Sequence, residues 1–419
     1  MIFIYILFNV VSILLSKLLY RKIVNPVSLY SVVWAIAVLI HQSGLIIYYE
    51  MEPFTWFVIF FLQSIFVAAS FFGWRIKCLD KVRSDVDDLS KNRLIQKKIE
   101  KYIVLTSVIS GIAIIGDFFI VVSVYGRDVL NHITDIYSDR VHQNVDLTTI
   151  PYLGSFVFIA TSLAGAYSKK YGFKLIVFLP LVLGGIRSLT TGGRAGLIFI
   201  MIIFVFSYLC YPKPYKAKGK ILALKNSNIV LLLGGAFLIF VAFLITVKRS
   251  ASGATPYATE RFRNLFGENA VVYNFLTYVG SPIGALNEYL RTCDFNFGQN
   301  TFLSIFNVLA RLGVIDRIDQ YQEFFFTPES CNVATWLREL IEDFTLVGAT
   351  IVVIFFGAVT SFVYKKAKVY QSIRNGIVWS ILAVVVALSF FDWRLRNAEF
   401  WISLFFGYLI GRKIDRTCN

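Results

Sequence analysis

Long apolar runs recur along the whole sequence, and they constrain its fold more than any other feature. A helix needs about 20 apolar residues to cross a bilayer, and eleven segments approach that requirement. Only 16% of the residues are charged, whereas about 25% are charged in soluble domains. The segments are residues 1–19, 28–48, 54–74, 103–124, 151–168, 174–190, 195–211, 229–247, 343–364, 376–391 and 398–411. This pattern predicts an all-α polytopic membrane protein with about eleven transmembrane helices.

The basic residues are divided unevenly between the two sides that these spans define. Of the 41 Lys and Arg residues, 27 fall on one side, in the loop 75–102 and in clusters at 17–22, 169–174, 213–225, 365–374 and 412–416. Because cytoplasmic loops are enriched in Lys and Arg, that side should be the cytoplasm. The N-terminus is then outside and the C-terminus inside. The net charge of +15 is explained by topology, so no nucleic-acid partner is expected.

Two of the outward segments are long, at residues 125–150 and 248–342. Long loops in compact proteins are usually functional. The second segment contains apolar stretches at 270–279 and 302–312, which can lie on the bilayer surface or pack over the bundle. We expect three parts: a bundle of about eight spans over 1–247, a large outer loop of short helices over 248–342, and C-terminal transmembrane helices over 343–419.

The outward basic residues are almost all of one type. Thirteen of these 14 residues are Arg, a preference that the positive-inside rule does not explain because it treats Lys and Arg alike. Arg presents a planar fork of N–H donors that matches phosphate and carboxylate. The set therefore predicts an outward site for an anionic ligand, although any single Arg is also compatible with pairing to an outward carboxylate.

Metal and cofactor chemistry find little support in the sequence. The three histidines, His41, His132 and His142, lack ligand-spaced partners, and no nucleotide-binding glycine motif is present. Asp85 and Asp87 have the spacing of a metal-binding pair, but they lie in a mixed-charge loop typical of a solvated segment. We therefore expect no metal and no cofactor.

A glycine-rich turn joins the sixth and seventh segments on the outward side. Arg187 precedes Gly192-Gly193-Arg194, and Arg194 begins the seventh segment. A helix N-terminus with an adjacent Arg suits a phosphate group, and an Arg at the outward start of a span opposes the usual charge bias. The alternative is an ordinary hairpin turn whose Arg marks the membrane boundary.

Further candidates lie in and near the large outward loop. Arg249 follows a span end, and Arg291 lies within the loop. Arg338 stands four residues before Glu342, the spacing of a helical ion pair. Asp117 lies inside the fourth segment and needs a partner there, whether structural or functional. Cys293 and Cys331 share the outward loop, so a disulfide between them remains open.

Three motifs together resemble the Wzy-type polysaccharide polymerases, the family that polymerises O-antigen or capsule repeat units. The first is Thr-Gly-Gly-Arg-Ala-Gly at 191–196, and the second is the stretch 278–290 around Asn287, Glu288 and Tyr289. The third includes Arg338 and Glu342-Asp343-Phe344. The family often has Gly after Asp-Phe, where this chain has Thr345.

The resemblance implies a GT-C-like membrane glycosyltransferase in the bacterial inner (plasma) membrane. Its donor and acceptor would be undecaprenyl-diphosphate-linked oligosaccharides, and the growing glycan would pass to a hydroxyl of the incoming unit without a metal. Its partners would be these lipid-linked oligosaccharides and membrane lipids. Whether a chain-length regulator also binds is left open. An O-antigen ligase and a lipid-linked oligosaccharide flippase or other transporter are the alternatives, although many transporters show internal repeats.

The resemblance also suggests roles for individual residues. Fixed Arg donors would stabilise the departing diphosphate, with Arg194 and Arg249 as first candidates and Arg291 and Arg338 as second. The other residues expected to contact substrate are Arg187, Tyr289 and Asn287. The acceptor hydroxyl needs a base, for which the candidates are Asp343, Glu288 and Glu268.

Overall fold

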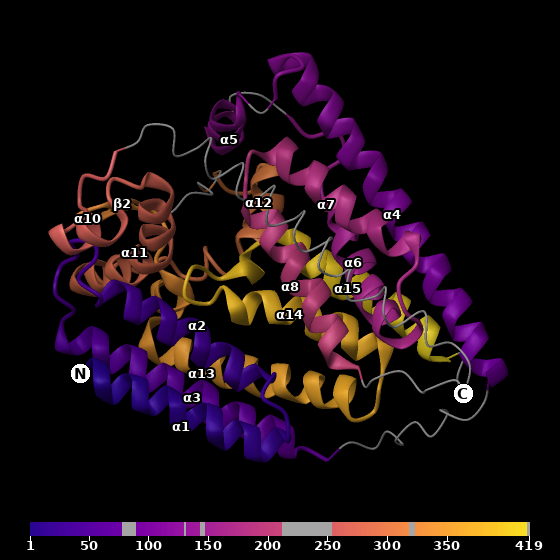
Figure 1. Cartoon of the computed structure of the whole chain (residues 1–419), viewed down its shortest axis with the longest axis horizontal. Coiled ribbons are helices and arrows are strands. Elements are labelled where there is room, and N and C mark those ends of the chain that lie inside the picture. Colours follow the sequence, from indigo (N-terminus) through magenta and orange to yellow (C-terminus); the bar gives the residue numbers. More distant parts are fainter. Residues whose placement is uncertain are drawn as a thin grey trace. The chain divides into compact units, whose positions relative to one another are not determined.

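The computed structural model describes residues 1–77, 89–129, 131–142, 147–211, 254–316, 318 and 323–416 (Figure 1). Most of these residues are helical. Four helices are long and apolar enough to cross a membrane: α1 (Ile2–Tyr20), α3 (Pro53–Arg75), the Asn92–Tyr125 part of α4 (Leu89–Tyr125), and α13 (Thr335–Lys368). Together with the shorter apolar helices, they support a helical membrane protein, as the sequence predicts.

The remaining predicted segments correspond to shorter helices. These are α2 (Pro26–His41), α6 (Phe156–Tyr171), α7 (Phe178–Thr191) after the 3-10 turn η2 (Leu175–Val177), α8 (Ala195–Cys210), α14 (Ile373–Ala387) and α15 (Ala398–Asp415). The predicted span 229–247 lies outside the described residues. The figure of eleven crossings therefore stays a prediction.

The helices form two compact units, each assembled from separate stretches of the chain. Unit 1 comprises Met1–Lys77, Ser252–Phe362 and Val385–Ala398, and unit 2 comprises Cys78–Ala251, Val363–Val384 and Glu399–Asn419. The boundaries differ from the three consecutive parts expected from the sequence, because helices distant in sequence pack together within each unit.

Unit 1 is built on α1, α2, α3 and the first part of α13, which run side by side (Figure 1). Small residues let α3 and α13 approach closely. A Cβ added at Gly73 would lie 2.1 Å from the Ala358 carbonyl oxygen, and one at Gly357 would lie 2.9 Å from the Phe66 carbonyl oxygen. Close approach through small residues is the usual way in which helices pack in membranes.

The segment 248–342, which the sequence predicts to be an outward loop, contributes three helices to unit 1 among its described residues. Helices α10 (Glu260–Phe266) and α12 (Leu303–Arg311) are short, as expected, but α11 (Ala270–Thr292) has 23 residues. It packs against α2 and α3 and against the ribbon of β1 (Phe325–Phe326) and β2 (Ser330–Cys331). The expectation of uniformly short helices is thus wrong for α11, whose buried side extends almost the whole length of the helix.

Unit 2 packs α6 against α4, α7 and α8, and Figure 1 shows these helices together. Gly165 of α6 lies so close to α8 that an added Cβ would be 2.6 Å from the Phe204 carbonyl oxygen. The same unit contains α5 (Ile133–His142), the 3-10 turn η1 (Leu153–Ser155) and most of α14 and α15.

Several helix ends follow from local sequence. Asn25 begins α2 by accepting the Ser28 N–H at 2.9 Å, with Pro26 at the first helical position. Asn269 likewise accepts the N–H groups of Val271 and Val272 at the start of α11. Helix α7 ends at Gly192, whose φ of 61° is readily adopted by glycine. These residues explain where the elements begin and end.

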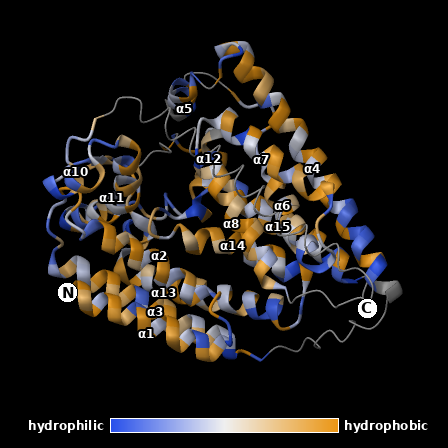
Figure 2. Ribbon diagram, viewed as in Figure 1, coloured by the Kyte–Doolittle hydropathy of each residue, from blue (hydrophilic) through white to orange (hydrophobic). Residues whose placement is uncertain are grey.

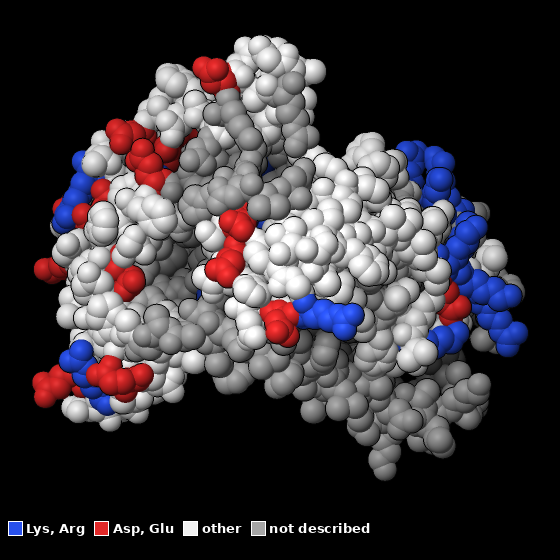
Figure 3. Space-filling model, turned by 90° about the horizontal axis from the view of Figure 1, so that it is seen from above, with Lys and Arg blue, Asp and Glu red and all other residues white. Residues whose placement is uncertain are grey.

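Each unit has one end rich in basic residues. In unit 1, the Tyr20 hydroxyl contacts Ser70 and Ser361, so the C-terminal ends of α1 and α3 meet where Lys17 and Arg75 lie. In unit 2, basic side chains gather near the beginning of α4 and the end of α6 (blue at right in Figure 3). Between their ends, the helices consist mostly of apolar residues (Figure 2).

Candidate functional site

Four charged residues are buried in the first turns of α13 in unit 1. Arg338, Glu339, Glu342 and Asp343 expose at most 5% of their surface. Placing charges away from water is costly unless they are paired and hydrogen-bonded. Intramembrane or boundary charges of this kind are candidates for a functional site.

Arg338 is held by both charge and aromatic rings. Its Nε lies 3.3 Å from Glu342 Oε2, which confirms the contact predicted from their helical spacing. Its guanidinium carbon lies 4.6 Å from the ring centroid of Phe325 and 5.4 Å from that of Tyr289. The rings favour the cation, and Glu342 in turn accepts a hydrogen bond from the Asn296 side chain.

A second pair of charges comes from the turn between α14 and α15. Arg396, in the 3-10 turn η3 (Arg394–Arg396), places Nη1 3.4 Å from Glu339 Oε1. Arg394 pairs with Asp392 at 2.6 Å. Burial raises the pKa of Asp392, and the nearby Arg394 opposes this effect. Among the described residues, Glu339 Oε2 has no hydrogen-bond partner, so the cluster retains a buried acceptor.

Asp343 has a structural role in this arrangement. Its Oδ1 accepts the Asn300 N–H at 3.0 Å, and its Oδ2 accepts the Thr301 N–H at 2.5 Å. These bonds fix the segment before α12 against α13. Because both carboxylate oxygens are engaged, Asp343 is less available as a base than the sequence suggests.

An apolar pocket adjoins the charged cluster in unit 1. Its volume is about 210 Å³, and Tyr289, which contacts Arg338, forms part of its wall. The other lining residues are Phe54, Val58, Leu290, Cys293, Asp294, Phe295, Ile341, Thr345 and Leu346. A mostly apolar wall next to fixed charges is a common composition of ligand sites.

The pocket includes a kink in α13. Thr345 has φ 59° and ψ 176°, a backbone conformation that interrupts the helix and that residues other than glycine rarely adopt. Thr345 adopts this conformation at an energetic cost.

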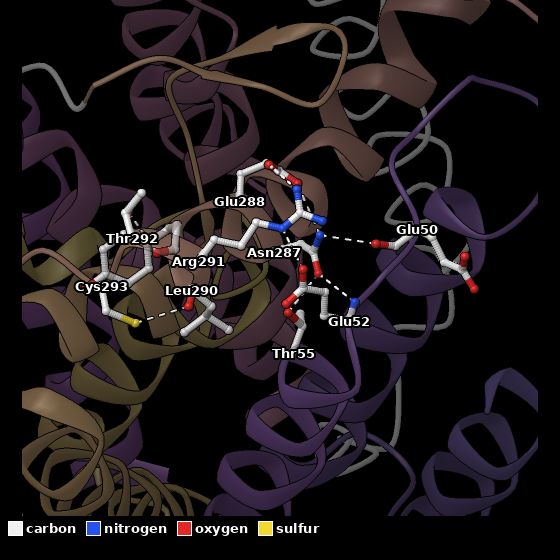
Figure 4. Close-up of polar contacts among 10 residues, drawn as sticks. Glu50, Glu52, Thr55, Asn287, Glu288, Leu290, Arg291, Thr292 and Cys293 are labelled. Carbon is white, nitrogen blue, oxygen red and sulfur yellow. Dashed lines mark hydrogen bonds and ion pairs between the residues drawn. The ribbon is translucent and has the colours of Figure 1, made fainter.

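The end of α11 is fastened to the start of α3, as Figure 4 shows. The Asn287 side-chain oxygen accepts from the Glu52 N–H at 2.9 Å and from the Thr55 hydroxyl at 2.8 Å. Arg291 lies between two carboxylates, 2.7 Å from Glu52 and 2.8 Å from Glu288. Asn287, Glu288 and Arg291 therefore form a latch that positions the neighbouring Tyr289.

The candidates of the glycine-rich turn belong to unit 2. Arg187 pairs with Glu399 and lies 5.1 Å from the Phe158 ring centroid. Arg194 stands at the start of α8, partly buried. Arg249, the other first candidate for the diphosphate, lies outside the described residues. The structure groups Arg187 and Arg194 in one unit and Arg291 and Arg338 in the other.

The remaining sequence candidates have structural partners. Glu268 is exposed and pairs with Arg263 at 2.9 Å. Asp117 accepts the N–H and hydroxyl of Thr149 at 2.7 and 2.8 Å. Cys293 and Cys331 are free thiols, so no disulfide joins them in this structure.

No group of three or more metal-ligating side chains with suitable geometry occurs within the part of the chain that the structure describes. The sequence had also not singled out Glu339, Asp392 or Arg396. The sequence feature that could have identified Asp392 and Arg396 is the charged turn at 392–396 between two apolar segments, where charge is unexpected.

No protein-family model, curated protein or solved structure matches this chain. The functional interpretation therefore depends on the residues and their geometry.

Proposed function

We propose that this chain is a polysaccharide polymerase of the bacterial inner membrane that uses lipid-diphosphate-linked repeat units. The observation that carries the proposal is the position of Arg338, which is buried against two aromatic rings and Glu342 beside the apolar pocket. A ligand with a charged diphosphate and a long apolar tail has the two chemistries that these neighbouring features offer. The proposal includes eleven spans, a GT-C-like architecture and an outward N-terminus.

In the proposed reaction, the apolar pocket receives the first isoprene units of the donor lipid, and Arg338 contacts its diphosphate. The bond between the sugar anomeric carbon and the phosphate oxygen breaks, and the acceptor hydroxyl oxygen forms a new bond to that carbon. The lipid diphosphate leaves with the electron pair of the broken bond. A fixed guanidinium stabilises the growing negative charge.

The acceptor hydroxyl must lose its proton to a base. Glu342 is favoured because the diphosphate competes with it for Arg338, which frees a carboxylate oxygen at the moment the donor binds. Asp343 is less suitable because two backbone N–H groups occupy its oxygens. Glu288 and Glu268 are each paired with Arg, and they remain secondary candidates.

Purified full-length protein in nanodiscs, incubated with an undecaprenyl-diphosphate-linked repeat unit, tests the activity directly. We expect a ladder of products that forms equally with and without chelator. Arg338→Lys keeps the charge but loses the planar fork, and we expect about a 100-fold lower rate, the effect of removing one transition-state donor. Arg127→Lys, the same change at an exposed Arg that has no place in the site, should retain most of the activity.

Two results would contradict the proposal. One is the absence of product from a verified substrate, and the other is a wild-type rate for Arg338→Lys. Gene deletion separates the alternatives: loss of a polymerase leaves single-repeat glycolipid, whereas loss of a ligase leaves none on the lipid A core and loss of a flippase leaves repeats facing the cytoplasm.

A further inference from the structure

Helix α12 exposes an apolar face that the packing of unit 1 leaves uncovered. Ile305, Val308 and Leu312 are 57%, 54% and 71% exposed. Their spacing places them on one side of the helix. Such a contiguous apolar surface outside the long spanning helices points to a membrane or protein contact.

The opposite side of α12 is attached to the charged turn of the candidate site. Leu303 is buried, and the Ser304 hydroxyl donates to the Arg396 carbonyl oxygen at 2.8 Å. The helix is thus held in a defined orientation, with one side against unit 1 and the apolar side away from it. The sequence predicts that this stretch packs over the bundle or lies on the bilayer surface. The structure shows that α12 packs on unit 1 with one side and leaves its other side exposed.

The exposed face of α12 continues onto a membrane-spanning helix. The ring of Phe302 meets the ring of Phe344 edge to face, with centroids 6.1 Å apart. Beyond Phe344, α13 exposes Val347, Ile351 and Phe355 at 72%, 63% and 70%. These residues recur every four positions, so they form a stripe along a helix that is long and apolar enough to cross the bilayer.

We infer that α12 lies in the interfacial region of the bilayer, with Ile305, Val308 and Leu312 buried among lipid chains. The continuity with the lipid-facing stripe of α13 selects lipid over a soluble protein partner. An amphipathic helix in this position buries its apolar face about 5–10 Å into the boundary between headgroups and chains. It would hold the 294–302 segment and the charged turn at the membrane surface, independently of the reaction that the site performs.

Site-directed spin labelling of the full chain, one copy per nanodisc, tests this inference. A cysteine-free variant that still folds receives single cysteines at Ile305 or Val308, each labelled with a nitroxide. Ile351→Cys is the lipid-exposed reference, Glu268→Cys is the water-exposed reference, and Asn307→Cys is the matched control on the other side of α12. At positions 305 and 308, we expect the spin label to be more accessible to oxygen than to a water-soluble nickel reagent. Its accessibility to oxygen at these two positions should also exceed that of a label at position 307.

Preferential access of the nickel reagent at 305 and 308 would overturn the inference, because the face would then be in water. Low access of both reagents would also overturn it, because protein and not lipid would cover the face. Folding of each variant is checked by size-exclusion chromatography and circular dichroism, and Val308→Cys keeps the test available if Ile305→Cys misfolds.

Discussion

At the scale of single residues, Thr345 is the clearest departure from ordinary backbone preference. Its φ of 59° and ψ of 176° fall in a region that glycine alone adopts easily. We expect Thr345→Gly to stabilise the protein by about 1 kcal/mol, the strain relieved less the entropy that glycine adds to the unfolded chain. Thr350→Gly, in the helical part of α13, should destabilise it by about 0.4 kcal/mol, the difference between the helix penalties of glycine and threonine relative to alanine. Thermal unfolding in detergent checks both, and a lower unfolding temperature for Thr345→Gly would contradict the expectation.

Asn287 and Arg291 allow a comparison of buried and exposed polar contacts in the latch. Asn287 is 1% exposed and accepts two hydrogen bonds, so Asn287→Ala should cost about 2–3 kcal/mol by leaving buried donors unsatisfied. Arg291 is 44% exposed, and Arg291→Ala should cost less than about 1 kcal/mol. Denaturation of both purified variants decides the order, and equal losses would show that the latch depends on its ion pairs.

Some residues of the site could be predicted from the sequence and others could not. The spacing of Arg338 and Glu342 was sufficient to predict their contact. Asp343 looked equally suitable as a base, but its oxygens bond to Asn300 and Thr301, more than 40 positions earlier. Local spacing contains no information on such distant backbone partners.

At the scale of elements, the stability of the first turns of α13 depends on the pairing of their buried charges. Removing one member of a buried pair leaves the other without compensation, so Arg338→Leu should destabilise the protein by about 3–5 kcal/mol. The double variant Arg338→Leu/Glu342→Leu should recover most of that loss, because two apolar side chains replace both charges. Unfolding measurements on the two variants test this. Equal instability of single and double variants would mean that the pair is not the source of the loss.

The apolar segments predicted most helices correctly because burial in lipid requires runs of apolar residues. The length of α11 was underestimated because its apolar residues are interrupted by polar ones, which α2, α3 and the β1–β2 ribbon accommodate. Helix α4 begins before its apolar run, at Leu89, since helix formation does not require apolar residues on every side.

At the scale of the whole molecule, the division into two units could not be predicted from the order of segments. Close helix contacts depend on glycines such as Gly73 and Gly165 and on the residues facing them, and hydropathy does not identify those partners. The distribution of charge was more informative. Each unit taken by itself has a basic end, as expected if both cross the membrane with the cytoplasmic side where the sequence places it.

Cysteine labelling tests this orientation. Cys293 is exposed and lines the apolar pocket beside Phe54, at the start of α3, whereas Tyr20 contacts Ser70 near the other end of α3. Cys293 should therefore react from outside the cell with a membrane-impermeant maleimide. Lys97→Cys, on the basic part of α4, should react only after the membrane is opened. Burial raises the pKa of Cys293, so its thiolate fraction and labelling rate should increase as pH rises from 7 to 8.

The labelling uses a chain in which the other native cysteines are replaced by Ser, and Cys293→Ser gives the background signal. Burial raises the pKa of Cys331 to about 11, so a chain that retains Cys331 in place of Cys293 should label far more slowly at the same pH. If intact cells label Lys97→Cys but not Cys293, the orientation is the reverse of the predicted one. That result would place Arg338 and the charged turn on the cytoplasmic side, where the proposed polymerisation does not occur.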